Sequence, residues 1–278
     1  MSTIRQKKIA IVNDVTGFGR CSVSVALPFI SALKVQGCIL PTAIFSSHTG
    51  FEHFFFEDYT SKMNAYINKW EQLNLSFDGI YTGFLGSKEQ IEIVCNFLKK
   101  FKTKDTIAII DPVMGDYGKI YPTYTKEMCE EMKRLVKFAD VMTPNLTEVC
   151  NLLDINYPKE MLSYEELEKL AHSLAIQGPK KIVITGLQRN DGYIENFVYE
   201  EGKPYSIVRA KKIGIDRSGT GDVFCSIIAA DAVNGINFVD SVKKASNFIS
   251  KCLEFTTKLN MPSNYGVCFE ELLGTLKP

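Results

Sequence analysis

One stretch of the chain joins a glycine-rich turn to an apolar run: Asp216-Arg217-Ser218-Gly219-Thr220-Gly221-Asp222 is followed by Val223-Phe224-Cys225-Ser226-Ile227-Ile228-Ala229-Ala230. The run predicts a buried helix that extends to about Asn234. The first N–H groups of a helix have no partner within it, and the helix dipole is positive at that end. Because glycines let the backbone approach a ligand closely, the stretch predicts a phosphate-binding site at the helix start.

A carboxylate at the end of this turn suits proton transfer. Asp222 lies one residue from the predicted anion site, where it could accept a proton from a hydroxyl group that attacks phosphorus. The position also has a simpler interpretation, because the helix dipole alone favours an acidic side chain in a first turn. The stretch by itself does not separate these two interpretations, so the rest of the chain must be considered.

The composition is that of an ordinary globular protein and argues against several functions. Of 278 residues, 45% are hydrophobic and 23% are charged, and 32 Lys and Arg balance 32 Asp and Glu. No basic field for nucleic acid is therefore expected, and no apolar run is long enough to cross a membrane. The eight cysteines are spread singly, which predicts free thiols in a reducing cytoplasm rather than disulfides or a zinc site.

Apolar strands alternate with helices along the chain. The expected strands are 8–13, 38–45, 78–82, 106–110, 139–142 and 181–185, with a hairpin of 193–199 and 205–210. The expected helices are 21–35, 58–73, 87–99, 127–138, 164–177, 222–234 and 239–257, with Ser87 and Ser163 as N-caps. This order predicts an α/β fold with a mostly parallel sheet covered by helices on both faces. Since no linker is evident, residues 1–278 are expected to form a single domain.

Polar loops follow the expected parallel strands, whose carboxyl ends meet at one edge of the sheet, where ligands bind. These loops are 14–19, 46–50, 83–86, 111–116, 143–148 and 185–186. Within them, Asp111, Asp116 and Glu148 could hold Mg²⁺ directly or through water, because this ion prefers oxygen ligands. Simpler interpretations exist here too, with Asp111 in an ordinary turn and Glu148 as an acid in a first helical turn.

Taken together, these motifs resemble the ribokinase-like superfamily. The motifs are Gly219-Thr220-Gly221-Asp222, Asp111-Pro112-Val113-Met114-Gly115-Asp116, and Thr143-Pro144-Asn145 with Glu148. More narrowly, Phe45-Ser46-Ser47-His48-Thr49-Gly50-Phe51 and Thr82-Gly83-Phe84 are similar to the Ser-Asn-His-Thr-Gly-Tyr and Thr-Gly-Tyr motifs of pyridoxal and pyridoxamine kinases. The resemblance implies a three-layer α/β/α fold with a mostly parallel central sheet, without the separate β-lid of sugar kinases, and a homodimer.

The resemblance also implies an activity and a set of site residues. The activity is ATP-dependent phosphorylation of the 5′-hydroxymethyl group of a vitamin B6 compound, namely pyridoxal, pyridoxamine or pyridoxine. Asp222 is implied as the catalytic base, and Gly219, Thr220 and Gly221 as the anion hole. Mg²⁺ is implied beside Asp116 and Glu148, and a requirement for a monovalent cation such as K⁺ stays open. The implied nucleotide-binding residues are Asp111, Thr143, Glu148, Thr185, Arg217, Ser218, Gly219 and Thr220. The implied substrate contacts are Asp14, His48, Thr49, Phe84, Tyr121 and Asp222, although His48 is equally an ordinary polar loop residue.

The first loop departs from the pyridoxal kinase pattern. Asn13-Asp14-Val15-Thr16-Gly17-Phe18-Gly19 is more similar to the Ser-Asp-x-Ser-Gly-Gly-Ala-Gly loop of hydroxymethylpyrimidine kinases. Three functions are therefore considered: a kinase for vitamin B6 compounds, a hydroxymethylpyrimidine or phosphomethylpyrimidine kinase of thiamine synthesis, and a catalytically silent B6-binding protein. The loop 46–51 favours the first. Asp222 and the acidic residues argue against the third, because a carrier needs neither.

Overall fold

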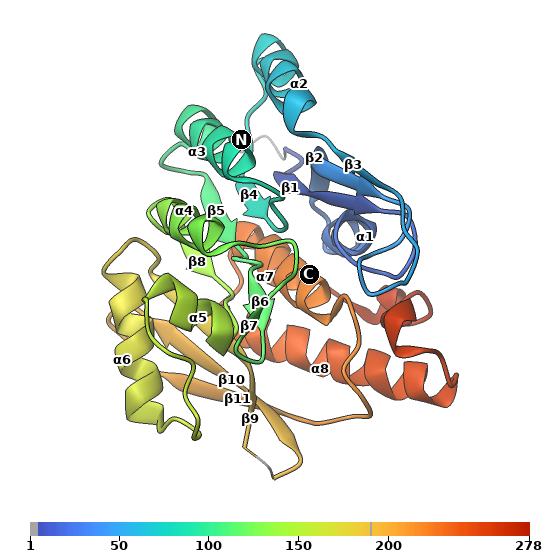
Figure 1. The fold of residues 1–278 in the computed structure, drawn as a ribbon, viewed down its shortest axis with the longest axis vertical. Coiled ribbons are helices and arrows are strands. Elements are labelled where there is room, and N and C mark those ends of the chain that lie inside the picture. The colour runs from blue at the N-terminus through green and yellow to red at the C-terminus, as the bar shows by residue number, and fades with distance from the viewer. Residues whose placement is uncertain (1–4, 190) are drawn as a thin grey trace.

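A single large sheet runs through the computed structural model, which describes residues 5–189 and 191–278 (Figure 1). Its strands are β1 (Lys8–Thr16), β2 (Gln36–Phe45), β3 (Phe56–Asp58), β4 (Gly79–Thr82), β5 (Ile107–Ile110), β8 (Val141–Met142), β9 (Lys181–Gln188), β10 (Tyr193–Glu200) and β11 (Ser206–Lys211). Within the described residues the order is β11-β10-β9-β8-β5-β4-β1-β2-β3. The strands from β9 to β2 pair in parallel, and β3, β10 and β11 pair antiparallel. The prediction of a mostly parallel sheet is confirmed.

Helices cover both faces of the sheet. They are α1 (Val23–Ala32), α2 (Thr60–Gln72), α3 (Lys88–Phe101), α4 (Lys126–Val136), α5 (Leu146–Leu152), α6 (Tyr164–Ala175), α7 (Thr220–Asn234) and α8 (Phe238–Lys258). Side chains of β1 alternate between two cores: Ala10 and Val12 pack with α2 to α6, and Ile9 and Ile11 with α1, α7 and α8. Because parallel strands are buried on both faces, they appear in the sequence as continuous apolar runs.

Local signals fix the ends of several helices as predicted. The hydroxyl of Ser87 accepts a hydrogen bond from the N–H of Gln90 (3.2 Å), and that of Ser163 accepts one from Glu166 (3.2 Å). Each hydroxyl satisfies an N–H group that has no partner within its helix. All eight cysteines have free thiols, as predicted, and seven of them are buried.

Three parts of the chain differ from the sequence expectation. Strand β1 continues to Thr16, so Asp14 lies in the strand rather than in a loop. The Thr16 hydroxyl donates a hydrogen bond to Asp14 Oδ2 (2.5 Å). The expected helix 58–73 begins at Thr60, because the residues before it pair with β2 as β3. The expected loops 111–116 and 143–148 contain the start of a hairpin, β6 (Gly115–Asp116) and β7 (Lys119–Ile120), and the start of α5.

No separate β-lid domain occurs in the part of the chain that the structure describes. The β6–β7 hairpin is the only sheet there besides the central one. The chain ends with two short 3₁₀ turns, η1 (Ser263–Tyr265) and η2 (Leu273–Thr275), and the red C-terminal segment returns to the blue N-terminal region (Figure 1). None of the described helices has the length and apolar character needed to cross a membrane. Because one sheet carries both cores, we propose residues 1–278 as a single domain.

Candidate active site

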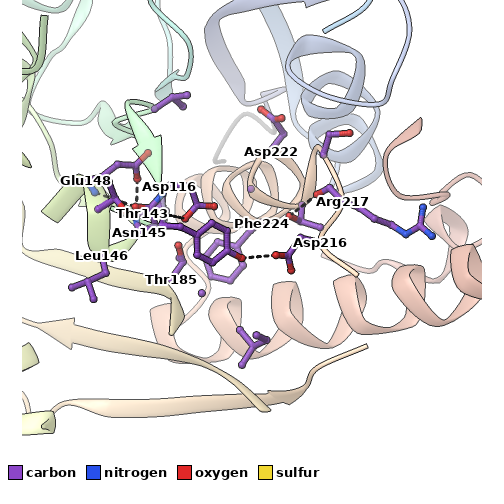
Figure 2. Close-up of a pocket in the computed structure, with 18 of the residues that line it drawn as sticks. Asp116, Thr143, Asn145, Leu146, Glu148, Thr185, Asp216, Arg217, Asp222 and Phe224 are labelled. Atoms are coloured by element: carbon purple, nitrogen blue, oxygen red, sulfur yellow. Dashed lines mark hydrogen bonds between the residues drawn. The ribbon is translucent and has the colours of Figure 1, made fainter. Parts of the chain in front are cut away.

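A cavity of about 880 Å³ lies at the carboxyl edge of the parallel strands (Figure 2). Side chains from the ends of β1 and β9 and from the loops after β1, β2, β4, β5 and β8 line it together with the start of α7. The prediction that these loops converge is confirmed. Every site residue implied by the sequence lines the cavity: Asp14, His48, Thr49, Phe84, Asp111, Asp116, Tyr121, Thr143, Glu148, Thr185, Arg217, Ser218, Gly219, Thr220, Gly221 and Asp222.

The start of α7 is open to an anion. Gly219 precedes the helix in the left-handed region, with a φ of 81°, and no side chain among the described residues caps it. The first-turn N–H groups therefore keep their hydrogen-bonding capacity at the positive end of the dipole. A Cβ at Gly221 would meet no atom within 4 Å, whereas a Cβ at Gly219 would overlap the carbonyl oxygen of Arg20. Gly221 thus keeps the approach open, and Gly219 is required by packing.

Asp222 lies in the first turn of α7 and is partly exposed at the cavity wall. Burial of the carboxyl group raises its pKa to about 6. The neighbouring Ser22 backbone and Asn13 side chain lower the pKa, and the charge of Asp14 raises it. A carboxylate with a pKa near 6 is mostly ionised at pH 7 and is more basic than an ordinary aspartate. This balance suits a group that accepts a proton.

The carboxylates of Asp111, Asp116 and Glu148 line the same cavity. Burial raises the pKa of Asp111, and the charge of Asp222 raises it further, while the Thr143 hydroxyl donates to Asp111 Oδ1 (3.1 Å) and lowers it. Asp116 is exposed as a residue, but the partial burial of its carboxyl group raises the pKa of that group. None of the ion pairs formed by residues 5–189 and 191–278 involves Asp111, Asp116 or Glu148. This part of the cavity therefore brings carboxyl groups together without a basic partner.

Glu148 also has a task in the fold, since it is the third residue of α5. Its Oε2 accepts from the N–H of Asn145 (2.8 Å), which forms a capping box, and its Oε1 accepts from the N–H of Met114 (3.2 Å). The simpler interpretation, an acid in a first helical turn, describes this position correctly. Burial and the charge of Asp111 still raise the pKa of Glu148. A carboxylate oxygen with one hydrogen bond keeps a lone pair for a second contact.

The acidic end of the cavity fits Mg²⁺. Its donors are carboxylate oxygens, which this ion prefers, and a cation would favour their ionised form, which burial and neighbouring charges disfavour. No group of three His, Cys, Asp or Glu side chains within the described ranges is arranged to hold a metal ion alone. Mg²⁺ in phosphoryl-transfer sites usually has one or two protein carboxylates, with phosphate oxygens and water completing the shell.

Another part of the cavity suits a flat ring with polar substituents. The rings of Phe45 and Phe84 have centroids 6.0 Å apart and an interplanar angle of 70°. Asp14 is buried beside them in the cavity lining, and Thr49 is exposed. Burial raises the pKa of Asp14, whereas hydrogen bonds from Ser22 and Thr16 lower it. Aromatic walls with a buried carboxylate and a hydroxyl can bind a heterocycle and fix its orientation.

His48 and Arg217 use polar side-chain atoms in contacts with the C-terminal turn at η1 (residues 261–264), so these atoms are not free in the cavity. His48 Nε2 donates to the carbonyl oxygen of Asn264 (2.8 Å), and its Nδ1 accepts from a backbone N–H of its own loop (3.1 Å). Arg217 Nη1 donates to the carbonyl oxygens of Met261 and Pro262, each at 2.9 Å. Figure 2 shows the Arg217 guanidinium directed away from the carboxylates. Both side chains thus hold their loops in place.

Several further side chains reach the cavity that the sequence did not predict. Tyr117, between β6 and β7, donates its hydroxyl to Asp216 Oδ2 (2.5 Å) and connects the hairpin to the loop before α7. Ser22 adopts a φ of 55°, which is unusual for a residue other than glycine. Asn13 is buried at the cavity wall. Its signal in the sequence was a polar residue in an otherwise apolar strand.

Comparisons with known proteins agree on a group of small-molecule kinases. The profile of the phosphomethylpyrimidine kinase family matches residues 27–267. The chloroplastic thiamine biosynthetic bifunctional enzyme of Arabidopsis thaliana is 28% identical over 205 residues, which are 73% of this chain and 38% of that protein. This chain therefore spans little more than a third of that relative. A pyridoxal kinase of Actinobacillus pleuropneumoniae is 26% identical over 187 residues, which are 64% of this chain and 63% of that kinase.

A solved structure is similar over nearly the whole chain. It is a provisionally assigned phosphomethylpyrimidine kinase from Bacteroides thetaiotaomicron VPI-5482, in a crystal form with pyridoxal. The sequence identity is 36%, the TM-score is 0.94, and the match covers 98% of this chain and 96% of that one. The predicted three-layer fold is thereby confirmed in a protein of related sequence.

Two glycine variants separate packing from ligand binding at the start of α7. Gly219→Ala would overlap the carbonyl oxygen of Arg20 and strain a left-handed residue, so we expect it to lower stability by more than about 1 kcal/mol. Gly221→Ala places a methyl group in open space at a helical position, so the melting temperature should hardly change. Its binding of ADP or inorganic phosphate should weaken, because the methyl group narrows the anion site. Melting curves and calorimetric titration test both, and equal stability of the two variants would contradict the assignment.

Proposed function

The chain belongs to the phosphomethylpyrimidine kinase family, and on that premise we propose that it transfers the terminal phosphoryl group of ATP to the hydroxymethyl group of a vitamin B6 compound. The observation that carries the proposal is the shared cavity. In it, Asp222 and the uncapped start of α7 lie together with the carboxylates of Asp111 and Glu148 and with an aromatic pocket. A phosphoryl transfer needs each of these parts: a base, an anion hole, a place for a cation and a place for the acceptor.

In the proposed reaction, Asp222 is the base for the acceptor hydroxyl. The hydroxyl oxygen forms a bond to the terminal phosphorus of ATP while the bond from phosphorus to the ADP oxygen breaks. The hydroxyl proton passes to the Asp222 carboxylate. The N–H groups of Thr220 and Gly221 bind the oxygens of the transferred group, where negative charge is concentrated during the transfer.

The acidic end of the cavity is proposed to serve the nucleotide and its metal ion. Asp116 and Glu148 would hold Mg²⁺ directly or through water, and when bound this ion neutralises phosphate charge. Thr143, Thr185 and Ser218 line the path proposed for the nucleotide. Because the His48 and Arg217 side chains donate to the C-terminal turn, we assign them to positioning these loops rather than to direct ligand contacts.

The proposed acceptor is a vitamin B6 ring because of the loop 46–51 and the relative with bound pyridoxal. Thr49 can donate to or accept from the phenolic oxygen or the ring nitrogen. Asp14 can pair with a protonated ring nitrogen or with the ammonium group of pyridoxamine. We further propose a cytoplasmic homodimer that binds no nucleic acid or membrane, as the resemblance and the balanced charge imply.

Hydroxymethylpyrimidine is the second candidate acceptor. The matching family profile is that of the phosphomethylpyrimidine kinases, and the loop from Asn13 to Gly19 is similar to theirs. The exocyclic amine of a pyrimidine could donate to Asp14, so this residue does not distinguish the two rings. A silent B6-binding protein remains disfavoured, because it would need no base at Asp222.

A competition between the two rings distinguishes the candidates. With pyridoxal and hydroxymethylpyrimidine at equal concentration, ATP and Mg²⁺, we expect pyridoxal phosphate to accumulate first. The expected preference in kcat/KM is about tenfold or more, worth roughly 1.4 kcal/mol, which one or two ring contacts can supply. Chromatography of both phosphorylated products gives the ratio. Earlier accumulation of the pyrimidine monophosphate would favour the second candidate.

The base is tested with Asp222→Asn, which keeps the shape of the side chain and removes its basicity. We expect kcat to fall by roughly 10²–10⁴-fold, while ADP binding changes little because the anion donors are backbone N–H groups. Burial raises the pKa of Asp222 to about 6, so kcat of the unmodified protein should fall as the pH drops through 6, where the base becomes protonated. The variant should lack this dependence. Near-normal turnover in the variant would exclude Asp222 as the base.

The metal role of Glu148 is tested against a matched change elsewhere. Glu148→Gln and Glu166→Gln both alter the third residue of a helix, α5 and α6 respectively, where it completes a capping box, but only Glu148 lines the cavity. We expect Glu148→Gln to raise the Mg²⁺ concentration at half-maximal activity several-fold, because a neutral amide is a weaker ligand than a carboxylate. Glu166→Gln should leave it unchanged. If both variants kept the same midpoint, Glu148 would serve only as a helix cap.

A further inference from the structure

The amide of Asn13 is held in one orientation at the end of β1. Its side chain is 1% exposed. Its Oδ1 accepts hydrogen bonds from the N–H of Asp14 (2.9 Å) and from the N–H of Phe84 (2.9 Å). Both partners are donors, so the atom that faces them is the oxygen, and the NH₂ group points the other way.

The NH₂ group of Asn13 has no partner in the part of the chain that the structure describes. Its Nδ2 is buried, and the residue lines the cavity beside Asp222. Buried polar side-chain atoms nearly always have a hydrogen-bond partner, so an unpaired donor in a cavity wall indicates a ligand atom. The Asn13 amide lies near enough to Asp222 to lower the pKa of its carboxyl group, although among the described residues no hydrogen bond of normal geometry joins them.

Gly83, which directly follows the neighbouring strand β4, leaves room for the Asn13 amide. A Cβ at Gly83 would overlap the Asn13 side chain, and the next residue, Phe84, supplies one of the two N–H groups that orient it. The Thr-Gly-aromatic motif at 82–84 thus has a structural purpose. Thr16, the other side chain at this end of β1 that can donate a hydrogen bond, already donates its hydroxyl to Asp14 (2.5 Å). Asn13 is therefore the donor from β1 that is free for a ligand.

We propose that Asn13 is a catalytic residue whose Nδ2–H donates to the hydroxymethyl oxygen of the substrate, while that hydroxyl donates its proton toward Asp222. The assignment rests on the proposed function. As the oxygen bonds to phosphorus and the bond to the ADP oxygen breaks, the proton passes to Asp222. The amide stabilises the negative charge that develops on the oxygen in this step. Both candidate rings carry a hydroxymethyl group, so the role does not depend on which one is the substrate.

The test uses Asn13→Asp, which keeps the size and the acceptor oxygen but removes the donor, and Asn13→Ala, which adds no charge. We expect kcat to fall by roughly 10²–10³-fold in both, as for a lost transition-state donor. The KM for the ring substrate should stay within about twofold. The control is Gln90→Glu, which is also an amide-to-acid change. Like Asn13, Gln90 supports the loop 83–86 by accepting one of its backbone N–H groups. Gln90 accepts from Gly86 N–H (2.7 Å) and donates to the Thr42 carbonyl (2.8 Å), but does not line the cavity. Gln90→Glu should have a lower melting temperature and an unchanged kcat.

Each outcome has a distinct meaning. A reduced kcat in both Asn13 variants with unchanged KM supports the assignment. A raised KM with normal kcat would overturn it and assign the amide to ring binding. A normal kcat in Asn13→Ala would also overturn it, because the slow Asn13→Asp variant would then reflect its added charge. Absence of turnover by the unmodified protein with every ring would instead overturn the proposed function, and the assignment with it.

Discussion

The geometry of the site depends on how closely the turn before α7 approaches the loop after β1. Gly219 packs against the carbonyl group of Arg20, and the Ser218 hydroxyl lies 3.4 Å from the carbonyl oxygen of Gly19. On the other side of this contact, Arg20 and Ser22 have φ angles of 50° and 55°. Such conformations cost free energy in residues with a Cβ and persist only where surrounding contacts fix them. The turn before α7 and the loop after β1 are therefore one packed unit rather than two independent loops.

The C-terminal turn η1 holds this unit from outside the cavity. Arg20 Nη1 donates to the carbonyl oxygen of Tyr265 (3.0 Å), as His48 and Arg217 do to carbonyl groups nearby, and Phe18 packs edge-on against the Tyr265 ring (4.9 Å). Donors from three loops thus meet one short segment that follows the last helix. In Figure 1 the red C-terminal segment accordingly lies beside the blue loops near α1. Residues that never line the cavity consequently help to set its shape.

The sequence predicted what local physics encodes and missed what depends on distant backbone groups. Apolar runs identified the parallel strands, and hydroxyl side chains marked the starts of α3 and α6. The extension of β1 was missed because the pairing of Asp14 with Thr16 leaves no apolar periodicity. The partners of His48 and Arg217 are carbonyl oxygens 216 and 44 positions away. Every residue type offers a carbonyl group, so no pattern in the sequence could have indicated these contacts, although it correctly predicted which loops converge.

The charge of the cavity links the two ligands of the proposed reaction. Burial raises the pKa values of Asp111, Glu148 and Asp222, and the charge of a neighbouring carboxylate raises each of them further. No ion pair of the described residues includes any of the three. A nucleotide adds several negative charges to this space, and the N–H groups at the start of α7 offset only part of them. A divalent cation reverses the balance, because it attracts the carboxylates and the phosphates at once. Nucleotide and Mg²⁺ should therefore strengthen the binding of each other, and by linkage the effect must be equal in both directions.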